Sequence, residues 1–155
     1  MLAETTKLLI DDWVRRHGDS RDQLLPLLHA ILDEIGYVDD GAVPMLAAAL
    51  NLSRADVHGV LTFYHDYRRT PAGKHVVKLC RAESCQARGG AAMEAAAAAR
   101  FGVAMGETRR DGQVSLEPVY CLGLCAIGPN ALVDGRPIAR LDIAALDRIA
   151  SEIAA

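Results

Sequence analysis

Apolar residues recur every three or four positions through the first 70 residues, which is the period of an amphipathic α-helix. Four helices are predicted there, around residues 8–14, 24–35, 41–50 and 54–64. Ser20 and Gln23 have the spacing of a capping box that would begin the second helix, and Gly36 would end it. Ser53 and Asp56 have the same spacing before the fourth. We expect these apolar faces to pack together as a helical bundle.

The pattern changes after a turn-rich stretch at residues 69–74, where β-branched runs begin. The elements predicted beyond it are a strand at 75–80, an alanine-rich helix at 89–101, a strand at 114–119, two strands at 131–133 and 137–141, and a last helix capped by Asp142. Asp134 and Gly135 form a two-residue hairpin signal between the last two strands.

The order of these elements predicts the fold class, α+β or α/β. The first strand, the alanine-rich helix and the second strand should form a right-handed parallel crossover. A hairpin and a helix complete a small mixed sheet covered by two helices, which is a thioredoxin-like topology. We therefore expect two domains, a helical domain at residues 1–70 and a thioredoxin-like domain at residues 71–155.

Composition and charge narrow the classes of function. About half of the 155 residues are hydrophobic, and the net charge of −3 argues against binding nucleic acid through phosphate contacts. No segment approaches the ~20 apolar residues that span a bilayer, and residues 1–7 lack the basic start of a signal peptide. We expect a cytoplasmic protein without membrane insertion, whose thiols stay reduced.

The four cysteines of the chain fall in two close pairs. Cys80 and Cys85 form C-x4-C, Cys121 and Cys125 form C-x3-C, and 35 residues separate the pairs. Cys80 ends the first predicted strand and Cys121 follows the second. If these strands are parallel neighbours, both loops leave the sheet at the same edge and the four sulfurs can converge. We interpret them as ligands of one iron–sulfur cluster.

A two-iron cluster suits a shallow site of this kind. Such a cluster with four thiolates is negatively charged, and reduction adds one more negative charge that the protein must stabilise. Gly123 lets backbone N–H groups approach the sulfurs closely. The N-terminus of the alanine-rich helix, together with Arg81 and Arg88, would add positive potential.

The spacing leaves other interpretations open. A structural zinc site would use the same four cysteines, although neither spacing is the usual C-x2-C. Two disulfides would be unusual in a reducing compartment, and a catalytic dithiol would want the C-x-x-C that is absent here. Phe63, Tyr64, His65 and Tyr67 either pack at the domain joint or form part of a partner interface.

Three segments resemble one known family. They are GVLTFY at residues 59–64, CRAESCQ at 80–86 and CLGLCAIGP at 121–129. They resemble the thioredoxin-like [2Fe–2S] ferredoxin family, which includes a subunit of NADH–quinone oxidoreductase, and the resemblance runs over residues 20–150. The chain looks most similar to the gamma subunits of molybdenum-dependent, NAD-linked formate dehydrogenases, and its AIGP segment at residues 126–129 resembles the formate dehydrogenase and hydrogenase-associated branch.

The resemblance implies a function. The four cysteines would hold one [2Fe–2S] cluster that exchanges single electrons with FMN in a partner flavoprotein. FMN, NAD and the molybdenum cofactor would lie in partner subunits, among them a formate dehydrogenase catalytic subunit, and the helical domain would dock the flavoprotein. The chain has no G-x-G-x-x-G loop, so we expect no catalysis by it alone. The alternatives are the equivalent subunit of complex I or of an NAD-linked hydrogenase, and a zinc-stabilised scaffold.

Overall fold

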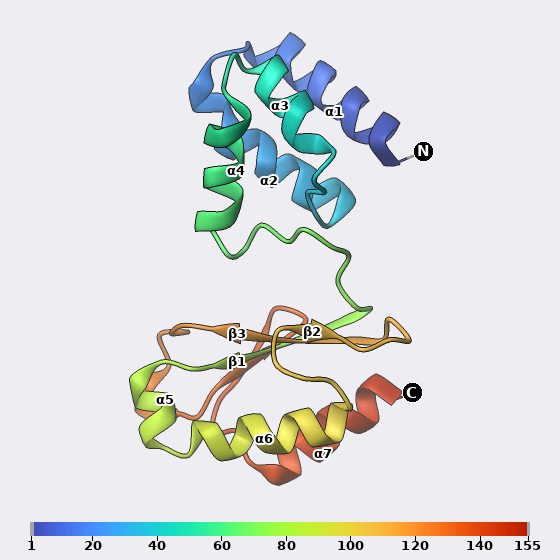
Figure 1. Cartoon of the computed structure of the whole chain (residues 1–155). Helices are drawn as coiled ribbons and strands as arrows, with labels where there is room; N and C mark the ends of the chain where they lie inside the picture. Colours follow the sequence, from blue (N-terminus) through green and yellow to red (C-terminus); the bar gives the residue numbers. More distant parts are fainter. Residues whose placement is uncertain (1, 155) are drawn as a thin grey trace. The chain divides into compact units, whose positions relative to one another are not determined.

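The chain divides into two compact units, one ending at Pro71 and the other beginning at Ala72 (Figure 1). This is a computed structural model, and it describes residues 2–154. Each unit has a hydrophobic core of its own. None of the helices described within residues 2–154 is both long and apolar enough to cross a membrane.

Among the residues that the structure describes, the first unit contains four α-helices and one short 3₁₀ turn. These are α1 (Leu2–His17), the turn η1 (Arg21–Gln23), α2 (Leu24–Ile35), α3 (Ala42–Ala49) and α4 (Arg54–Phe63). Helix α1 packs on α2 and α3, and α3 packs on α4. The core between them holds fully buried side chains from three helices, such as Leu28 of α2, Leu46 of α3 and Val57 of α4. The predicted helical packing is therefore present in this unit.

Two of the helix-end predictions have different outcomes. The Ser53–Asp56 capping box is confirmed, because Ser53 Oγ accepts from the Asp56 N–H at 3.0 Å and the Asp56 carboxylate accepts from the Ser53 N–H at 3.1 Å. The Ser20–Gln23 box is wrong, because the Ser20 side chain makes no cap bond and a 3₁₀ turn forms instead. Gln23 is engaged elsewhere, since its side-chain oxygen accepts from the Trp13 indole N–H at 3.3 Å.

The second unit is a five-stranded mixed sheet with helices. Its elements are β1 (His75–Cys80), α5 (Glu83–Ala87), α6 (Gly90–Phe101), β2 (Glu107–Thr108), β3 (Val114–Val119), the turn η2 (Cys125–Ile127), β4 (Ala131–Val133), β5 (Arg136–Ile138) and α7 (Ile143–Ala154). The strand order is β2-β3-β1-β4-β5. Strands β1 and β3 are parallel, and the other neighbours are antiparallel. The fold class and the parallel crossover are thereby confirmed.

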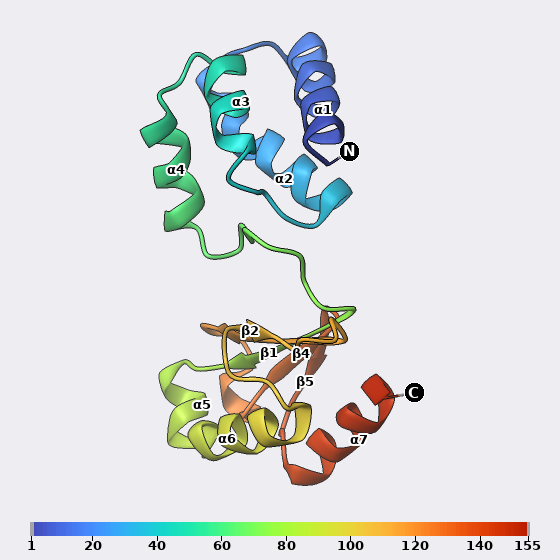
Figure 2. The ribbon, with the colours of Figure 1, turned by 45° about the vertical axis from the view of Figure 1, so that its right-hand side comes forward.

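The two long helices of this unit, α6 and α7, lie on the same face of the sheet (Figures 1 and 2). Alternation along β1 explains the burial, since Val77 and Leu79 point into the core formed with Phe101 of α6 and Leu146 of α7. Lys78, between them, faces the other way and pairs with Glu117 of β3 at 3.8 Å, directly across the strand register. One face of the sheet is thus apolar and covered, and polar pairs lie on the other.

Local differences from the predicted elements come from short segments. The two-residue strand β2, the helix α5 and the turn η2 carry too little periodicity to be read from the sequence. The last strand ends at Ile138 and not at 141, because Leu141 already packs in the core that α7 covers. The hairpin turn is confirmed, with φ of 49° at Asp134 and 80° at Gly135, the left-handed pair that a tight two-residue turn needs.

Candidate metal centre

The register of the parallel strands places both cysteine loops at one end of the sheet. Cys80 is the last residue of β1, and its strand partner in β3 is Val119. The next backbone bond runs from Arg81 N to Val119 O at 2.8 Å, so the strands separate only beyond Cys80. Cys121 follows two residues after Val119. Parallel pairing therefore brings the two cysteine loops together although 35 residues separate the two pairs.

The second thiol of the first pair is buried inside a short helix. Cys85 lies in α5 and is fully buried, whereas the sequence placed it in an irregular loop. Helix α5 begins directly after β1, and α6 then packs closely on it, because a Cβ added at Gly90 would come within 2.8 Å of the Cys85 carbonyl oxygen. The buried thiol is thus fixed by the close contact between two helices.

The second pair lies in a strained loop at the surface. Cys121 is exposed and has a positive φ of 76°, which costs a residue with a side chain about 1–3 kcal/mol. Its sulfur accepts the Gly123 N–H at 3.4 Å and lies 3.6 Å from the sulfur of Cys125, which is half-buried. Gly123 itself has a φ of 76°, so the predicted close approach of the backbone is present. In this conformation the Cys121 sulfur lies beside that of its partner.

Two side chains connect the cysteine loops to each other. The Ser84 hydroxyl donates to the Cys125 carbonyl oxygen at 3.1 Å. The side-chain amide of Asn130 donates to the Leu124 carbonyl oxygen at 2.8 Å and lies 3.6 Å from the Cys85 sulfur. Gly128 also approaches Cys85 closely, because a Cβ there would come within 3.2 Å of the Cys85 sulfur.

The pKa values of the Cys80, Cys85 and Cys125 thiols are shifted, and not all in the same direction. Burial would raise the pKa of the Cys80 thiol, but hydrogen bonds from the Ala82, Cys121 and Leu122 backbone N–H groups and from the Cys85 thiol outweigh it, so this pKa is lowered. Backbone donors to a sulfur favour its thiolate form. The fold thus prepares the Cys80 thiol to lose its proton.

The pKa values of Cys85 and Cys125 are raised instead of lowered. Burial raises the pKa of the Cys85 thiol, the neighbouring Cys80 raises it further, and donors from Asn130 offset only part of this. Its partner Cys121 raises the pKa of Cys125, by hydrogen bonding and by charge. Neighbouring thiolates within each pair repel each other, so a bound cation would be needed to hold all four cysteines deprotonated.

The donor set and its arrangement fit a two-iron cluster. Four thiols in two close pairs match that cluster, since each iron takes two thiolates. No three His, Cys, Asp or Glu side chains within residues 2–154 converge closely enough to hold a single metal ion as they stand. The three N–H donors to Cys80 and the Gly123 donor to Cys121 supply the hydrogen bonds that stabilise sulfur-centred negative charge.

The expected arginines contribute differently. The Arg81 guanidinium pairs with Glu94 of α6 at 3.0 Å, so its charge is largely offset there. Arg88 is exposed, and its aliphatic part packs near Gly128. Arg88 is the better placed of the two to add positive potential.

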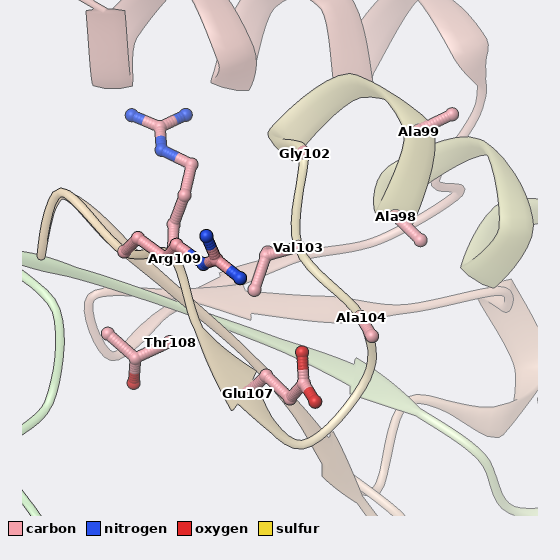
Figure 3. A pocket seen from close by; sticks show the side chains of 9 residues that line it. Ala98, Ala99, Gly102, Val103, Ala104, Glu107, Thr108 and Arg109 are labelled. Atoms are coloured by element: carbon pink, nitrogen blue, oxygen red, sulfur yellow. The ribbon is translucent and has the colours of Figure 1, made fainter.

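A separate hollow in the same unit lies between the end of α6 and β2, and Figure 3 shows its lining side chains. Arg109 in this hollow is already held by Asp111 at 2.9 Å and by the Phe101 carbonyl oxygen at 3.1 Å. None of the four cysteines lines it. The hollow is therefore distinct from the cysteine site.

Sequence reasoning did not find Asn130, Gly128 and Ser84. Asn130 and Gly128 flank a proline in the loop after Cys125, where amides and glycines usually mark an exposed turn. Only the burial of Asn130, which is 2% exposed, reveals that the loop folds inward onto Cys85. The available signals were that Ser84 lies between the cysteines of the first pair, that Gly128 lies three residues after Cys125, and that Asn130 lies two residues beyond Gly128.

Known proteins resemble this chain over most of its length. The sequence matches the family described as thioredoxin-like [2Fe-2S] ferredoxin over residues 10–154. A subunit of the NADH-quinone oxidoreductase of Pseudomonas aeruginosa is 31% identical over 134 residues, which are 86% of this chain and 81% of that protein. The Escherichia coli K12 protein of the same name is 32% identical over 133 residues, 86% of this chain and 80% of that protein.

A solved structure agrees with these relatives. A chain in the crystal structure of an NAD+-reducing [NiFe]-hydrogenase in the air-oxidized state matches with a TM-score of 0.70 and 27% identity. The match covers 85% of this chain but only 23% of that one, so the likeness concerns one region of a longer protein. Family match, relatives and fold point the same way, and the chain belongs to the thioredoxin-like [2Fe–2S] ferredoxin family.

Proposed function

We propose that this chain is an electron-transfer subunit of an NAD-linked oxidoreductase and that it carries one [2Fe–2S] cluster. The proposed ligands are the four cysteines, Cys80, Cys85, Cys121 and Cys125. The observation that carries this proposal is the parallel β1–β3 register, which brings both cysteine loops to one end of the sheet. Membership of a [2Fe–2S] family supports it independently.

The chain's own groups would bind the cluster and place it between the core and the surface. The thiolates bind, and the backbone N–H groups that donate to the Cys80 sulfur favour its deprotonation. The buried Cys85 and the exposed Cys121 place one side of the site in the core and the other at the surface. A bound [2Fe–2S] cluster supplies one-electron exchange. Exposure at Cys121 leaves a short route for an electron to or from a partner.

A flavoprotein that holds FMN and binds NAD is the proposed partner. Two of the relatives are named as subunits of an NADH-quinone oxidoreductase, and a structural neighbour is named an NAD+-reducing hydrogenase. Within this class we propose a formate dehydrogenase whose catalytic subunit holds a molybdenum cofactor. The AIGP segment at residues 126–129 supports that choice. We also propose a cytoplasmic location, because the site requires reduced thiols.

The first unit is proposed as the docking module. Phe63 is 73% exposed and Tyr64 44% exposed at the end of α4, where their rings meet edge to face at 5.0 Å. Large aromatic side chains left in solvent favour a protein partner. A chain truncated to begin near residue 70 should therefore assemble poorly with the flavoprotein. Equal assembly of the truncated and full chains would remove this role.

The cluster assignment is tested on the full chain purified without oxygen. We expect two iron and two sulfide ions per chain, a red-brown colour, and one spin-half EPR signal after dithionite reduction. Cys121→Ser should remove or shift that signal, because an exposed ligand is exchanged for a hard oxygen donor. A colourless protein that binds zinc and stays colourless after reconstitution with iron and sulfide would make the chain a scaffold instead.

The parent complex is tested by its substrate. Partner subunits recovered with the tagged chain from its native host should reduce NAD+ with formate, and that activity should depend on molybdenum in the medium. Hydrogen as the effective reductant would assign the chain to a hydrogenase. Oxidation of NADH by a quinone in the recovered complex would assign it to complex I. Either result would overturn the formate dehydrogenase proposal and leave the electron-transfer role standing.

A further inference from the structure

We propose that Asn130 is a positioning residue of the metal centre, which holds the sulfur of Cys85 and ties it to the Cys121–Cys125 loop. The inference rests on the proposed function, because it takes Cys85 to be a cluster ligand. Asn130 lies outside both cysteine pairs, and its role follows from contacts that the fold creates over 45 residues of sequence.

The orientation of the Asn130 amide is set by chemistry. Its side-chain nitrogen lies 2.8 Å from the Leu124 carbonyl oxygen, an atom that can only accept. The opposite orientation would place two acceptors against each other, so Nδ2 must occupy this position. The second hydrogen of the same nitrogen is then free to point at the Cys85 sulfur, 3.6 Å away. One amide group therefore bridges the two cysteine loops.

The side-chain oxygen of Asn130 lowers the stability of the fold. The residue is 2% exposed, and its side-chain oxygen is buried without a hydrogen-bond partner among the described residues. A buried unpaired acceptor destabilises a fold, and an apolar side chain of similar size would avoid that cost. An amide retained at such a cost indicates that its two donors are needed, and both of them go to the site.

The backbone of Asn130 serves the same cysteines. Its carbonyl oxygen accepts the Cys80 N–H at 3.0 Å. Its own N–H is a second donor to the Cys85 sulfur. Gly128, two residues earlier, lets the loop approach so closely that a Cβ there would touch that sulfur at 3.2 Å. Asn130 thus contacts both cysteines of the first pair and the loop of the second.

Two consequences follow for a bound cluster. Donors to a ligand sulfur stabilise the more negative, reduced state and therefore raise the reduction potential. The bridge from Cys85 to Leu124 also fixes the spacing of the two pairs, which determines the shape of the site. Both effects are lost when the amide becomes an alkyl group, although the backbone donors remain.

The test uses the full chain, reconstituted with iron and sulfide, with Asn130→Leu as the variant. At a fixed solution potential we expect the ratio of reduced to oxidised cluster to fall about three- to tenfold, where tenfold equals 59 mV for one electron. The EPR g-values should shift as well. Gln113→Leu is the matched control, because it removes an amide at the opposite end of β3 and should change neither quantity.

The outcomes separate this inference from the proposed function. A wild-type chain without iron, sulfide or EPR signal overturns the proposed function and the inference with it. A wild-type cluster whose potential and g-values are the same in Asn130→Leu overturns the inference alone. A folded Asn130→Leu chain that takes up no cluster supports the positioning role. If Asn130→Leu does not fold, Asn130→Ser decides, because an unchanged ratio in that variant overturns the inference.

Discussion

Gly128 lies close to the buried Cys85 thiol, and it shows how one missing side chain shapes the site. An added Cβ would lie 3.2 Å from the Cys85 sulfur and 3.5 Å from both the Asn130 amide nitrogen and the Arg88 side chain. The Cys85 thiol is fully buried and the Asn130 amide is hydrogen-bonded to the Leu124 carbonyl oxygen, so these two neighbours have little room to move. The absence of a Cβ here matters more than the conformational freedom of glycine.

Gly128→Ala should therefore disturb the site more than the fold. Overpacking of this size costs about 1–3 kcal/mol, and we expect the displaced Cys85 sulfur to lower the iron bound per chain. Iron and sulfide analysis with thermal unfolding measures both effects. Gly59→Ala is the control, because nothing lies within 4 Å of a Cβ there. Full iron occupancy in Gly128→Ala would contradict the close packing described.

Asp134 combines a turn conformation with a charge. Its carboxylate accepts the Val76 N–H at 2.7 Å and pairs with His75 Nδ1 at 2.8 Å. Burial would raise the pKa of this carboxyl, but the bonds from His75 and Val76 outweigh it and the pKa is lowered. A lowered pKa in the folded state adds stability above the unfolded value of about 3.9, and that stability is lost as pH falls through the folded value.

Asp134→Asn isolates this charge, because asparagine keeps the left-handed turn that precedes Gly135. At pH 7 the variant should be less stable by about 0.5 kcal/mol, a small value because the side chain is half exposed and screened. The difference should shrink as the pH falls from about 4 through the lowered folded pKa, because the wild-type carboxyl then becomes protonated. Urea unfolding at pH 7 and pH 3 measures it. A difference that stays constant between these values would show that the charge contributes nothing.

At the scale of elements, helix α4 shows why one capping signal was reliable and another was not. The Ser53–Asp56 box forms because both side chains are exposed and hydrogen-bond to each other and to each other's backbone N–H groups. The Ser20–Gln23 signal fails because Gln23 is bonded to Trp13, which belongs to a different helix. A local signal therefore decides an element end only where tertiary contacts leave its side chains free.

Helix α4 gives a pair of opposite predictions. Ser53→Ala removes the cap and should lower the free energy of unfolding of the first unit by about 1 kcal/mol. Gly59→Ala, in the middle of the same helix with open space around it, should raise it by about 0.5–1 kcal/mol. Denaturant unfolding followed by circular dichroism compares them. Equal midpoints for the two variants would mean that α4 is not formed as described.

At the scale of the whole molecule, the two units have separate hydrophobic cores. Leu28 is fully buried in the first core, and Leu116 is fully buried in the second. The four cysteines and the residues that position them all belong to the second unit. Stability and cluster binding are therefore expected to depend on different cores.

Leu28→Ala should destabilise the first unit by about 2–5 kcal/mol, the usual cost of a large-to-small change in a packed core. The visible spectrum of the bound cluster should stay at its wild-type form, since no cysteine lies in that unit. Leu116→Ala is the counterpart in the second unit and should lower cluster retention. Loss of the spectrum in Leu28→Ala would show that the second unit depends on the first.

Interactions between residues close along the chain allowed much of the secondary structure to be predicted from the sequence. Helical and alternating periods gave the long helices and β1 and β3, and Asp134–Gly135 gave the hairpin, because these signals act between residues close along the chain. The fold class and the [2Fe–2S] family were likewise predicted and are confirmed. The cysteine types and their spacing suggested the chemistry before any contact was known.

Only the tertiary structure decided which strands pair and what surrounds each thiol. The register that sets Cys80 opposite Val119 depends on packing between distant segments. Asn130 reaches Cys85 across 45 residues, and nothing in its local sequence distinguishes it from a turn residue at the surface. The sequence predicted two close pairs of thiols, because the spacing within each pair is a local property. That all four act together as ligands stays a prediction. The folded chain determined how each is buried and hydrogen-bonded, because those contacts exist only after the sheet has formed.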